Sequence, residues 1–503
     1  TLDVVTTGAN NTGVGYGVLT NNTASDNTGV GKWALNSNTT GDYNTSVGSG
    51  ALDSNTTGDR NTAVGYNALT TNVDGDRNVA IGYQALKTMD PSSNADTMNV
   101  GVGYAALEAT TTGVNNTAVG GYVMQQNTTG GYSCAFGEQA LTANTTGDLN
   151  TALGYQALKA NTTGANQVAI GAYALDGATT DGGNSVAIGY LAASGVVASP
   201  VVAVGYRALF ANTTGASNTA VGYDAMITNT TGSYNTALGA FALDASNTAY
   251  NTAIGYKALS LLSTGSQNTA VGFAALEDLT TGSYNTAVGI EAGRNVTTGS
   301  SNTIVGRNAM DAAVTGDANT AIGVKALRLT TSGDDNTAVG YQAMDANTTG
   351  NYNTAVGYYA LGSMSTGRDS VAVGYKALEN TTSDENTGLG YQALKANTTG
   401  ANNTAVGHEA LYTNTTGSNC TAVGKDALRV NTASNNTAIG FDALKGNTTA
   451  AGNTALGCNA GEANTTGSNN VYVGHNAGLN ITTTNSNTVV GFEAMSASAG
   501  ADA

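Results

Sequence analysis

The sequence is short of the residues on which most folds and sites depend. Its 503 residues include 2 Pro, 3 Cys, 2 His and 1 Trp, and only 10% of them are charged, against roughly 25% in ordinary globular domains. Cys134, Cys420 and Cys458 are far apart and show no CxxC or Cys/His spacing. These absences exclude a disulfide framework and a cysteine-based zinc site. No run approaches 18 apolar residues, which excludes a membrane-spanning helix.

Basic residues are also scarce, because 17 Lys+Arg face 34 Asp+Glu and the formal net charge is −17. An acidic surface repels phosphate groups, so we expect neither nucleic-acid binding nor membrane insertion. No GxSxG elbow, P-loop or HExxH motif occurs. We therefore expect no enzyme activity, no catalytic residues and no cofactor. The chain begins at Thr1 without a Met, so we interpret it as a piece of a longer product.

The sequence consists largely of one short motif that is repeated many times. "NTAVGYNALTTN" at Asn61–Asn72 returns as "NTALGYQALKAN" at Asn150–Asn161 and as "NTAVGYYALGSM" at Asn353–Met364. Aligning the chain on the Gly of this phrase, here called the key Gly, gives 29 copies at a spacing of 17 residues almost throughout. A fixed short period over a whole chain is typical of a solenoid. We therefore predict a single continuous repeat domain over residues 1–503, with a loop insertion near residues 87–99.

The repeat predicts strands rather than helices. Its unit, N-T-A-V-G-Y-x-A-L-x-x-N-T-T-G-x-x, is rich in Thr, Val, Asn and Gly and has no 3.6-residue period. Thr and Val alternate in segments such as Thr62–Val64, as in a strand. Asn-Thr-Thr-Gly is turn chemistry, because Asn and Gly tolerate positive φ. Two short strands and two bends would fill 17 residues, which predicts an all-β, parallel β-solenoid (β-roll) of about 29 coils.

Different positions of the unit vary to different degrees. The residue three places after the key Gly is Ala in 27 of 29 copies, and the next is usually Leu. A position restricted to Ala is one where nothing larger fits. We predict a core stack formed by the aliphatic residue before the key Gly and this Ala-Leu pair. Representative members are Val64, Ala68, Leu69, Leu153, Ala157, Leu158, Val356, Ala360 and Leu361.

The residue after the key Gly varies more freely than these. It is often Tyr, but it is also Glu138, Lys425 or one of the two histidines, His408 and His475. A position that accepts Tyr, Glu and Lys lies at a surface. We therefore expect the tyrosines to form a ladder on the rim of the solenoid and both histidines to lie on its surface.

The predicted core is thin for 17 residues per coil, which raises the question of assembly. Each coil supplies one Val or Ile, one Leu and small Ala residues, while ordering the chain costs roughly 1–2 kcal/mol per residue. Three chains that pack their Leu/Ala strips along a common axis would bury more apolar surface. We therefore expect a side-by-side homotrimer.

A family resemblance points the same way. "NSVAIG" at Asn184–Gly189, "NVAIG" at Asn78–Gly82 and "SVAVG" at Ser370–Gly374 resemble the head repeats of trimeric autotransporter adhesins (YadA-like heads). Arrays of NTAVGxxAL also occur in bacteriophage tail-fibre proteins. The resemblance implies a left-handed β-roll with three chains side by side. The unit here is longer than the usual adhesin repeat, and the chain shows no coiled-coil stalk, membrane anchor or chaperone domain.

Several ligands were weighed against structural interpretations of the same residues. Asp in turns such as "TTGDRN" (Thr56–Asn61), "DGDRN" (Asp74–Asn78) and "SGDDN" (Ser332–Asn336) leaves room for calcium, although Asp in a Gly turn is more often a backbone cap. Asn-x-Thr occurs at Asn55, Asn144, Asn161, Asn212, Asn347 and Asn397 and matches the glycosylation acceptor, but the repeated turn generates it automatically. A regular Thr array suits ice, yet Val and Cys interrupt it. No receptor-binding residues stand out.

Together these observations predict a structural fibre protein. It would be a rod-like trimeric β-solenoid, extracellular, that projects from a virion or a bacterial cell surface and supports attachment of tail-fibre or adhesin type. Its partners would be copies of itself and a host-surface glycan or protein. The alternative is a self-assembling extracellular filament, formed by end-to-end stacking of solenoid units through open β edges.

Overall fold

The fold is an all-β parallel β-solenoid of about 28 turns with a repeat of about 17 residues. The computed structural model describes residues 7–178, 183–197 and 200–496, and no helix occurs in them. This confirms the predicted all-β, parallel β-solenoid with its 17-residue repeat. The chain clusters into two compact units, residues 1–250 and 251–503, which are described separately.

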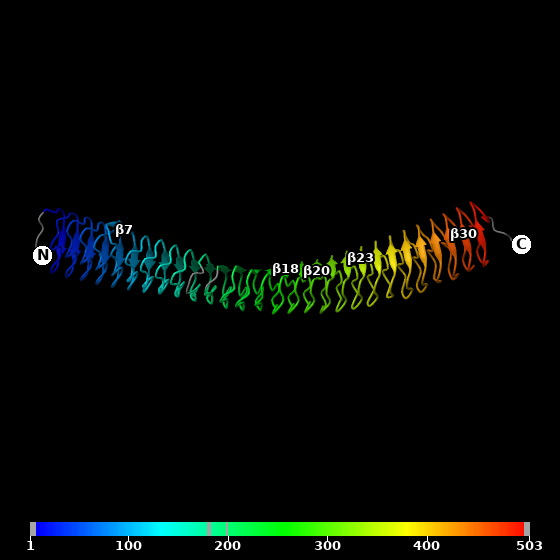
Figure 1. Ribbon diagram of the computed structural model, residues 1–503, viewed down its shortest axis with the longest axis horizontal. Coiled ribbons are helices and arrows are strands. Elements are labelled where there is room, and N and C mark those ends of the chain that lie inside the picture. Colours follow the sequence, from blue (N-terminus) through cyan, green and yellow to red (C-terminus); the bar gives the residue numbers. More distant parts are fainter. Residues whose placement is uncertain (1–6, 179–182, 198–199, 497–503) are drawn as a thin grey trace. The chain divides into compact units, whose positions relative to one another are not determined.

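The described residues of the first unit contain sixteen short strands. Fourteen of them belong to one parallel sheet, while β5 and β7 form a second, two-stranded sheet (Figure 1). The strands are β1 (Thr12–Val14), β2 (Thr28–Val30), β3 (Thr45–Val47), β4 (Thr62–Val64), β5 (Gly75–Asp76), β6 (Val79–Ile81), β7 (Ala95–Asp96), β8 (Val100–Val102), β9 (Thr117–Val119), β10 (Cys134–Phe136), β11 (Thr151–Leu153), β12 (Val168–Ile170), β13 (Val186–Ile188), β14 (Val201–Val204), β15 (Asn218–Val221) and β16 (Thr236–Leu238).

The second unit repeats the same arrangement with fifteen strands. They are β17 (Thr252–Ile254), β18 (Thr269–Val271), β19 (Thr286–Val288), β20 (Thr303–Val305), β21 (Thr320–Ile322), β22 (Thr337–Val339), β23 (Thr354–Val356), β24 (Val371–Val373), β25 (Thr387–Leu389), β26 (Thr404–Val406), β27 (Thr421–Val423), β28 (Thr437–Ile439), β29 (Thr454–Leu456), β30 (Val471–Val473) and β31 (Thr488–Val490).

The register of each sheet follows the repeat. In the first unit Thr62 pairs with Val79, Ala63 with Ala80 and Val64 with Ile81. Each strand thus lies against the equivalent residues of the next coil, and residues of the same repeat position form columns along each unit. Residues that align in the sequence on the key Gly therefore also lie next to one another in neighbouring coils.

Apart from the two coils that also contain β5 and β7, each described coil has one strand, not the two that the sequence suggested. The residues after the strand form a run of turns that are joined from coil to coil by backbone hydrogen bonds, for example from Leu69 N to Ala85 O (3.0 Å) and from Thr56 N to Val73 O (2.9 Å). These bonds satisfy the peptide groups as a ladder would. Turn stacking therefore replaces the second strand.

The positive φ angles also fall elsewhere than predicted. They occur at the key Gly (φ 139° at Gly65) and at non-glycine positions that include Arg60, Asn67 and Leu69, with φ between 51° and 57°. Gly58 of the Asn-Thr-Thr-Gly turn does not adopt such an angle. It is small for another reason, because a Cβ at Gly58 would lie 2.6 Å from the carbonyl oxygen of Gly75.

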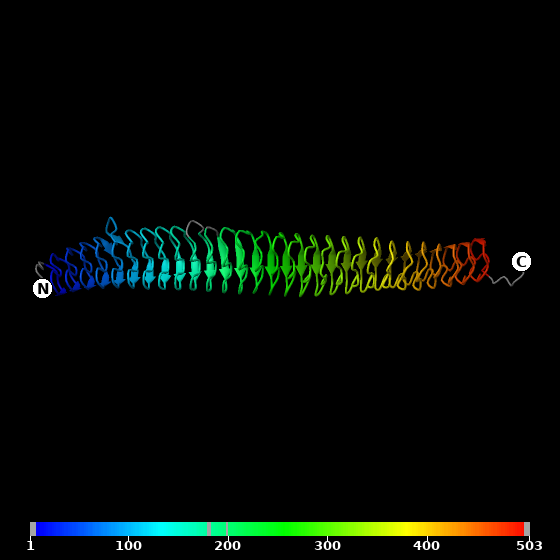
Figure 2. The ribbon, with the colours of Figure 1, turned by 90° about the horizontal axis from the view of Figure 1, so that it is seen from below.

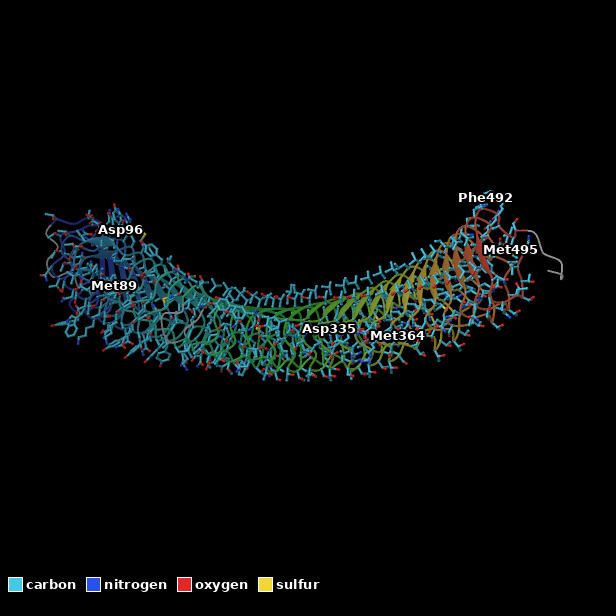
Figure 3. All side chains as sticks on the ribbon, turned by 45° about the vertical axis from the view of Figure 1, so that its right-hand side comes forward. Met89, Asp96, Asp335, Met364, Phe492 and Met495 are labelled. Atoms are coloured by element: carbon cyan, nitrogen blue, oxygen red, sulfur yellow. The ribbon has the colours of Figure 1, made fainter. Side chains whose placement is uncertain are left out.

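The interior of a coil is filled by small residues and one Leu. Ala63, Ala68 and Leu69 are fully buried, and so are the Asn residues at both ends of the turn run, Asn61 and Asn72. In Figure 3 the labelled Met89 and Met364, which replace the second of these Asn residues in their coils, can be located, and both are fully buried. Each unit therefore has a narrow core, part aliphatic and part amide.

The size of the strand-centre residue is linked to the size of the Leu position. In β30 the strand centre is Tyr472, fully buried, and the neighbouring Leu positions are Gly461 and Gly478. A Cβ at Gly461 would lie 2.5 Å from Tyr472 Cδ2. In β20 Ile304 fills the strand centre and faces Gly293 in the same way. The usual Ala is thus small because a Leu occupies the remaining space.

Residues 87–99, where the sequence predicts an insertion, lie between β6 and β8 of the first unit, and this part of the chain bulges from the stack of turns (Figure 2). The insertion contains the short strand β7, which the sequence did not suggest. β7 pairs in parallel with β5. Arg77 next to β5 forms an ion pair with Asp96 of β7. The enlarged coil therefore keeps its register with the coil before it.

Candidate functional site

The Ala-Leu pairs of the predicted core stack lie inside the solenoid, but its larger strand residues point outward. The Ala-Leu pairs are fully buried in all three representative coils: Ala68, Leu69, Ala157, Leu158, Ala360 and Leu361. Leu153 and Val356 are instead 49% and 36% exposed, and Val64 is half-buried. Side chains of a strand alternate between its two faces. Because the central Ala of each strand points inward, both of its neighbours point to the outside.

This inversion also corrects the predicted packing surface. The Leu/Ala strip was expected to meet other chains, but it is buried within a single chain. The surface that each unit leaves open is the outer strand face, defined here as the first and third residues of the three-residue strand core. In most coils these residues are Thr and an aliphatic residue.

The outer strand face carries a column of exposed aliphatic side chains and no charge. Of the chain's 51 charged residues (17 plus 34), none lies in a described strand of the main sheets. The exposed members are Val14, Val47, Ile81, Phe136, Leu153, Ile188, Val202 and Leu238 in the first unit, and Val288, Ile322, Val356, Val373, Ile439, Leu456 and Val490 in the second. Apolar columns that exclude charge over so many coils are unusual for a surface in contact with water only.

A second exposed column consists of the aromatic residues after the key Gly. In the first unit Tyr66, Tyr83 and Tyr104 stack at centroid distances of 5.5 and 4.9 Å. In the second unit Tyr358, Tyr375 and Tyr391 do so at 5.2 and 5.3 Å. The predicted rim ladder is therefore present. The key Gly alone separates each ring from the outer strand face in the sequence.

The Asn residues of the glycosylation pattern lie inside the solenoid. Asn55 is fully buried, and its Nδ2 donates to Gly58 O (2.9 Å) and to Asn38 Oδ1 in the preceding coil (2.8 Å). Asn144 and Asn161 repeat the pattern with their own neighbours. The amide nitrogen that a glycan would modify is thus occupied in a ladder. These bonds favour the turn interpretation of the acceptor sequences in the folded chain.

Aspartates of the turns that were weighed for calcium cap backbone groups in the coil before them. Asp59 Oδ1 accepts from Asp42 N and Asp76 Oδ1 accepts from Asp59 N, both at 2.7 Å. Asp334 accepts from Asp317 N at 2.8 Å in the second unit. Burial raises the pKa of Asp76, and the carboxylates of Asp59 and Asp96 raise it further. Each carboxylate binds the coil before it, which is the capping role of Asp in turns.

One group of side chains could hold a metal ion, and the sequence prediction missed it. His408 and Glu409 follow the key Gly of one coil, and Asp426 holds the position of Glu409 in the next coil. One ligand atom from each lies within 4.8 Å of the others. His408 was expected only as an exposed rim residue, and it is indeed exposed. The signal was available, because residues 17 positions apart are neighbours in a 17-residue solenoid.

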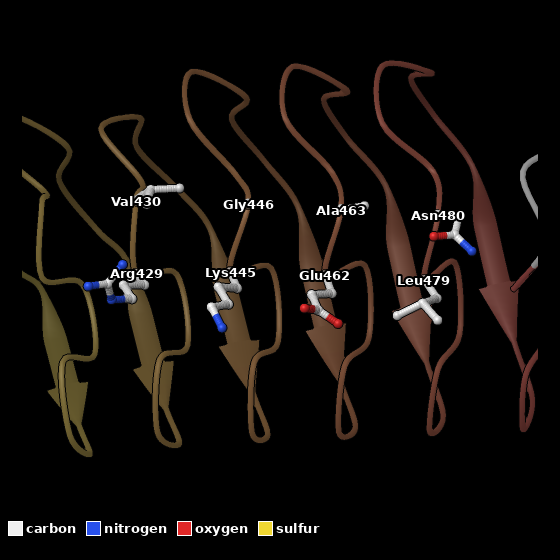
Figure 4. Close-up of a pocket in the computed structure, with 8 residues that line it drawn as sticks. All are labelled: Arg429, Val430, Lys445, Gly446, Glu462, Ala463, Leu479 and Asn480. Atoms are coloured by element: carbon white, nitrogen blue, oxygen red, sulfur yellow. The ribbon is translucent and has the colours of Figure 1, made fainter.

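A shallow groove of about 440 Å³ lies on the second unit, beside this group. Arg429, Lys445 and Glu462 line it together with Val430, Gly446, Ala463, Leu479 and Asn480 (Figure 4). Both cations are neutralised, since Arg429 Nε lies 2.7 Å from Glu409 Oε2 and Lys445 Nζ lies 3.1 Å from Asp442 Oδ2. The groove follows from the small residues Gly446 and Ala463 and presents no unpaired positive charge.

No helix in the described part of the chain is long and apolar enough to span a membrane. No protein-family model matches the chain, and no curated protein is significantly similar to it.

Proposed function

We propose that the chain is a structural fibre protein that acts as an extracellular spacer and assembles through its outer strand face. The observation that carries the proposal is the charge-free aliphatic column on that face. Soluble monomers rarely expose continuous apolar surface, and such surface marks interaction sites. A partner with the same column would cover it without burying an unpaired charge.

The partner we propose is the chain itself, as a side-by-side homotrimer. Equivalent columns from identical copies match along their whole length, because the register of Thr and aliphatic residues is constant from coil to coil. Tyrosine is common at interfaces because it combines apolar area with a polar tip, so the Tyr column would flank the contact. The number three follows from the resemblance to adhesin heads and tail fibres.

In this proposal the fibre projects from a virion or a bacterial cell and supports attachment to a host-surface glycan or protein. Hydrogen-bonded turns, buried Asn ladders and an acidic exterior suit a long soluble spacer.

The test is the native mass of the purified chain, with variants of the outer strand face. The double variant Val356→Lys/Val373→Lys places two charges on the column in neighbouring coils. The control is Leu329→Lys, because Leu329 has the same exposed fraction as Val373 (39%) but lies in a turn. We expect a mass near three chains by light scattering for the wild type and the control, and a single-chain mass for the double variant.

A folded single-chain mass for the wild type would refute the proposal. Filaments of indefinite length by electron microscopy would instead support the alternative of end-to-end stacking. A charge on an exposed face should leave the interior intact, so we expect the double variant to fold. Circular dichroism checks this.

A further inference from the structure

We propose that His408, Glu409 and Asp426 form a zinc(II) site that joins two neighbouring coils of the second unit. His408 and Glu409 belong to the turn after β26, and Asp426 belongs to the turn after β27. One imidazole nitrogen and two carboxylates form a ligand set that suits zinc. All three ligands come from a single chain, so the site does not depend on how copies assemble.

Each carboxylate uses one oxygen in a hydrogen bond to a cation. Glu409 Oε2 accepts from Arg429 Nε at 2.7 Å, and Asp426 Oδ2 accepts from Lys425 Nζ at 2.9 Å. Asp426 Oδ1 is buried and has no hydrogen bond, although Arg429 Nε lies 3.6 Å away. The hydrogen bonds of the two cations thus orient the carboxylates through Glu409 Oε2 and Asp426 Oδ2, as partners around metal ligands usually do, while a metal ion at Asp426 Oδ1 would compete with the ion pair to Arg429.

Burial favours the same assignment. The Asp426 side chain is only 9% exposed, and a buried carboxylate oxygen without a donor is costly. A metal ion at Oδ1 would satisfy it. His408 supplies the third ligand from the exposed side, where its ring stacks on Tyr391 at 4.9 Å. The ligand atoms span up to 4.8 Å, so the exposed imidazole must move inward on binding, and a water molecule would complete the tetrahedral set.

Zinc is favoured over calcium because of the ligand types. Calcium prefers six to eight oxygen ligands, whereas this group offers one nitrogen and few oxygens. Lys425 and Arg429 already balance the two carboxylates, so a bound dication gives the group a net positive charge, which limits its affinity. The site therefore predicts moderate affinity and selectivity for zinc-like ions.

The chain contains its own control. His475 holds the position of His408, but Asn476 replaces Glu409 and the exposed Glu493 replaces Asp426. This second group has one carboxylate fewer and no buried oxygen. If zinc binding reflected a surface histidine alone, both groups would bind equally.

The experiment measures Zn²⁺ binding to the chelator-treated full chain by equilibrium dialysis, and the visible absorption of Co²⁺ in its place. We expect one Zn²⁺ per chain, not displaced by excess Ca²⁺. His408→Ala and Glu409→Gln should each weaken binding by at least about tenfold and abolish the Co²⁺ band, while His475→Ala should change neither. Because His408 is exposed and Glu409→Gln is isosteric, both variants should fold, as checked by circular dichroism. Absence of saturable binding, or binding that survives both substitutions, would overturn the proposal.

Discussion

Around Tyr472 a large strand-centre residue is paired with small residues at the Leu positions, and this pairing gives the sharpest test of how the interior is packed. Tyr472 takes the place of the usual strand-centre Ala, and Gly461 and Gly478 take the place of the usual Leu. A side chain at Gly461 would overlap the Tyr472 ring, with its Cβ 2.5 Å from Cδ2. We therefore expect Gly461→Leu to destabilise the wild-type chain but to stabilise the Tyr472→Ala variant.

The magnitudes follow from burial and cavities. Tyr472→Ala removes a fully buried ring and leaves a cavity, which costs about 3–5 kcal/mol, reduced by about 1–3 kcal/mol because the unpaired Tyr472 hydroxyl no longer needs burial. In that background Gly461→Leu refills the space and contributes about 1.5–3 kcal/mol. It then loses about 1–2 kcal/mol, because φ at this position is positive. In the wild type the same Leu meets the ring, and overpacking costs about 1–3 kcal/mol.

The quantity to measure is the coupling free energy of a double-mutant cycle. Hydrogen exchange of amides in β29–β31 reports local opening, which suits a solenoid whose coils need not unfold together. A second cycle, which combines Tyr472→Ala with a truncation of Leu444 one coil before Gly461, serves as a control for nonspecific loss of packing. Equal effects of Gly461→Leu in both backgrounds would show that ring and Leu do not compete, and would refute the size-exchange argument.

Three further predictions concern single positions. Burial raises the pKa of Tyr472 to about 12, above its unfolded value near 10. The free energy of unfolding therefore does not change with pH through this group below pH ~10 and falls by about 3 kcal/mol as pH rises towards ~12; Tyr472→Phe should flatten this alkaline loss in unfolding curves. Gly120→Ala should destabilise its coil by about 3 kcal/mol or more, because φ is 133° and the added Cβ would lie 3.0 Å from Gly137 O. The control Gly121→Ala should be almost neutral in thermal unfolding, because only Glu138 Cγ lies near its Cβ, at 3.9 Å. Asn144→Ala should cost about 1–3 kcal/mol by breaking the Asn ladder, and Asn144→Leu should cost less, since Leu262 and Leu279 occupy the equivalent position; local hydrogen exchange distinguishes the two.

The coil type, its period and its register could be predicted from the sequence, because each depends on a feature that recurs every 17 residues. The direction of the side chains could not. Thr62 and Val64 were correctly placed on one face, but a three-residue strand does not reveal which face is inside. Size would have been the better guide: the position restricted to small residues, Ala63, faces the interior, where space is limited by Leu of the coil before.

The positions of the positive φ angles also could not be predicted from the sequence. Asn and Gly were expected to carry the positive φ, yet Leu69 carries one (51°). A buried Leu gains enough from packing to offset the strain of about 1–2 kcal/mol. Asn55 is retained for its side-chain hydrogen bonds instead. The metal-ligand group was missed because its members are remote in sequence and adjoin only after the coil is closed.

The outward aliphatic column and the inward Asn ladders are two consequences of one narrow cross-section. Because the interior admits Ala, Leu and hydrogen-bonded amides, the branched side chains of the strands lie outside, and much apolar surface remains uncovered within one chain. Stability and assembly should then be linked, since a partner that binds only folded coils stabilises them by mass action. We expect the melting temperature of the wild type to rise with protein concentration, and that of Val356→Lys/Val373→Lys to be lower and less dependent on it. A melting temperature independent of concentration in the wild type, measured by calorimetry over a hundredfold range, would show that the column is stable in water alone and that the narrow core suffices.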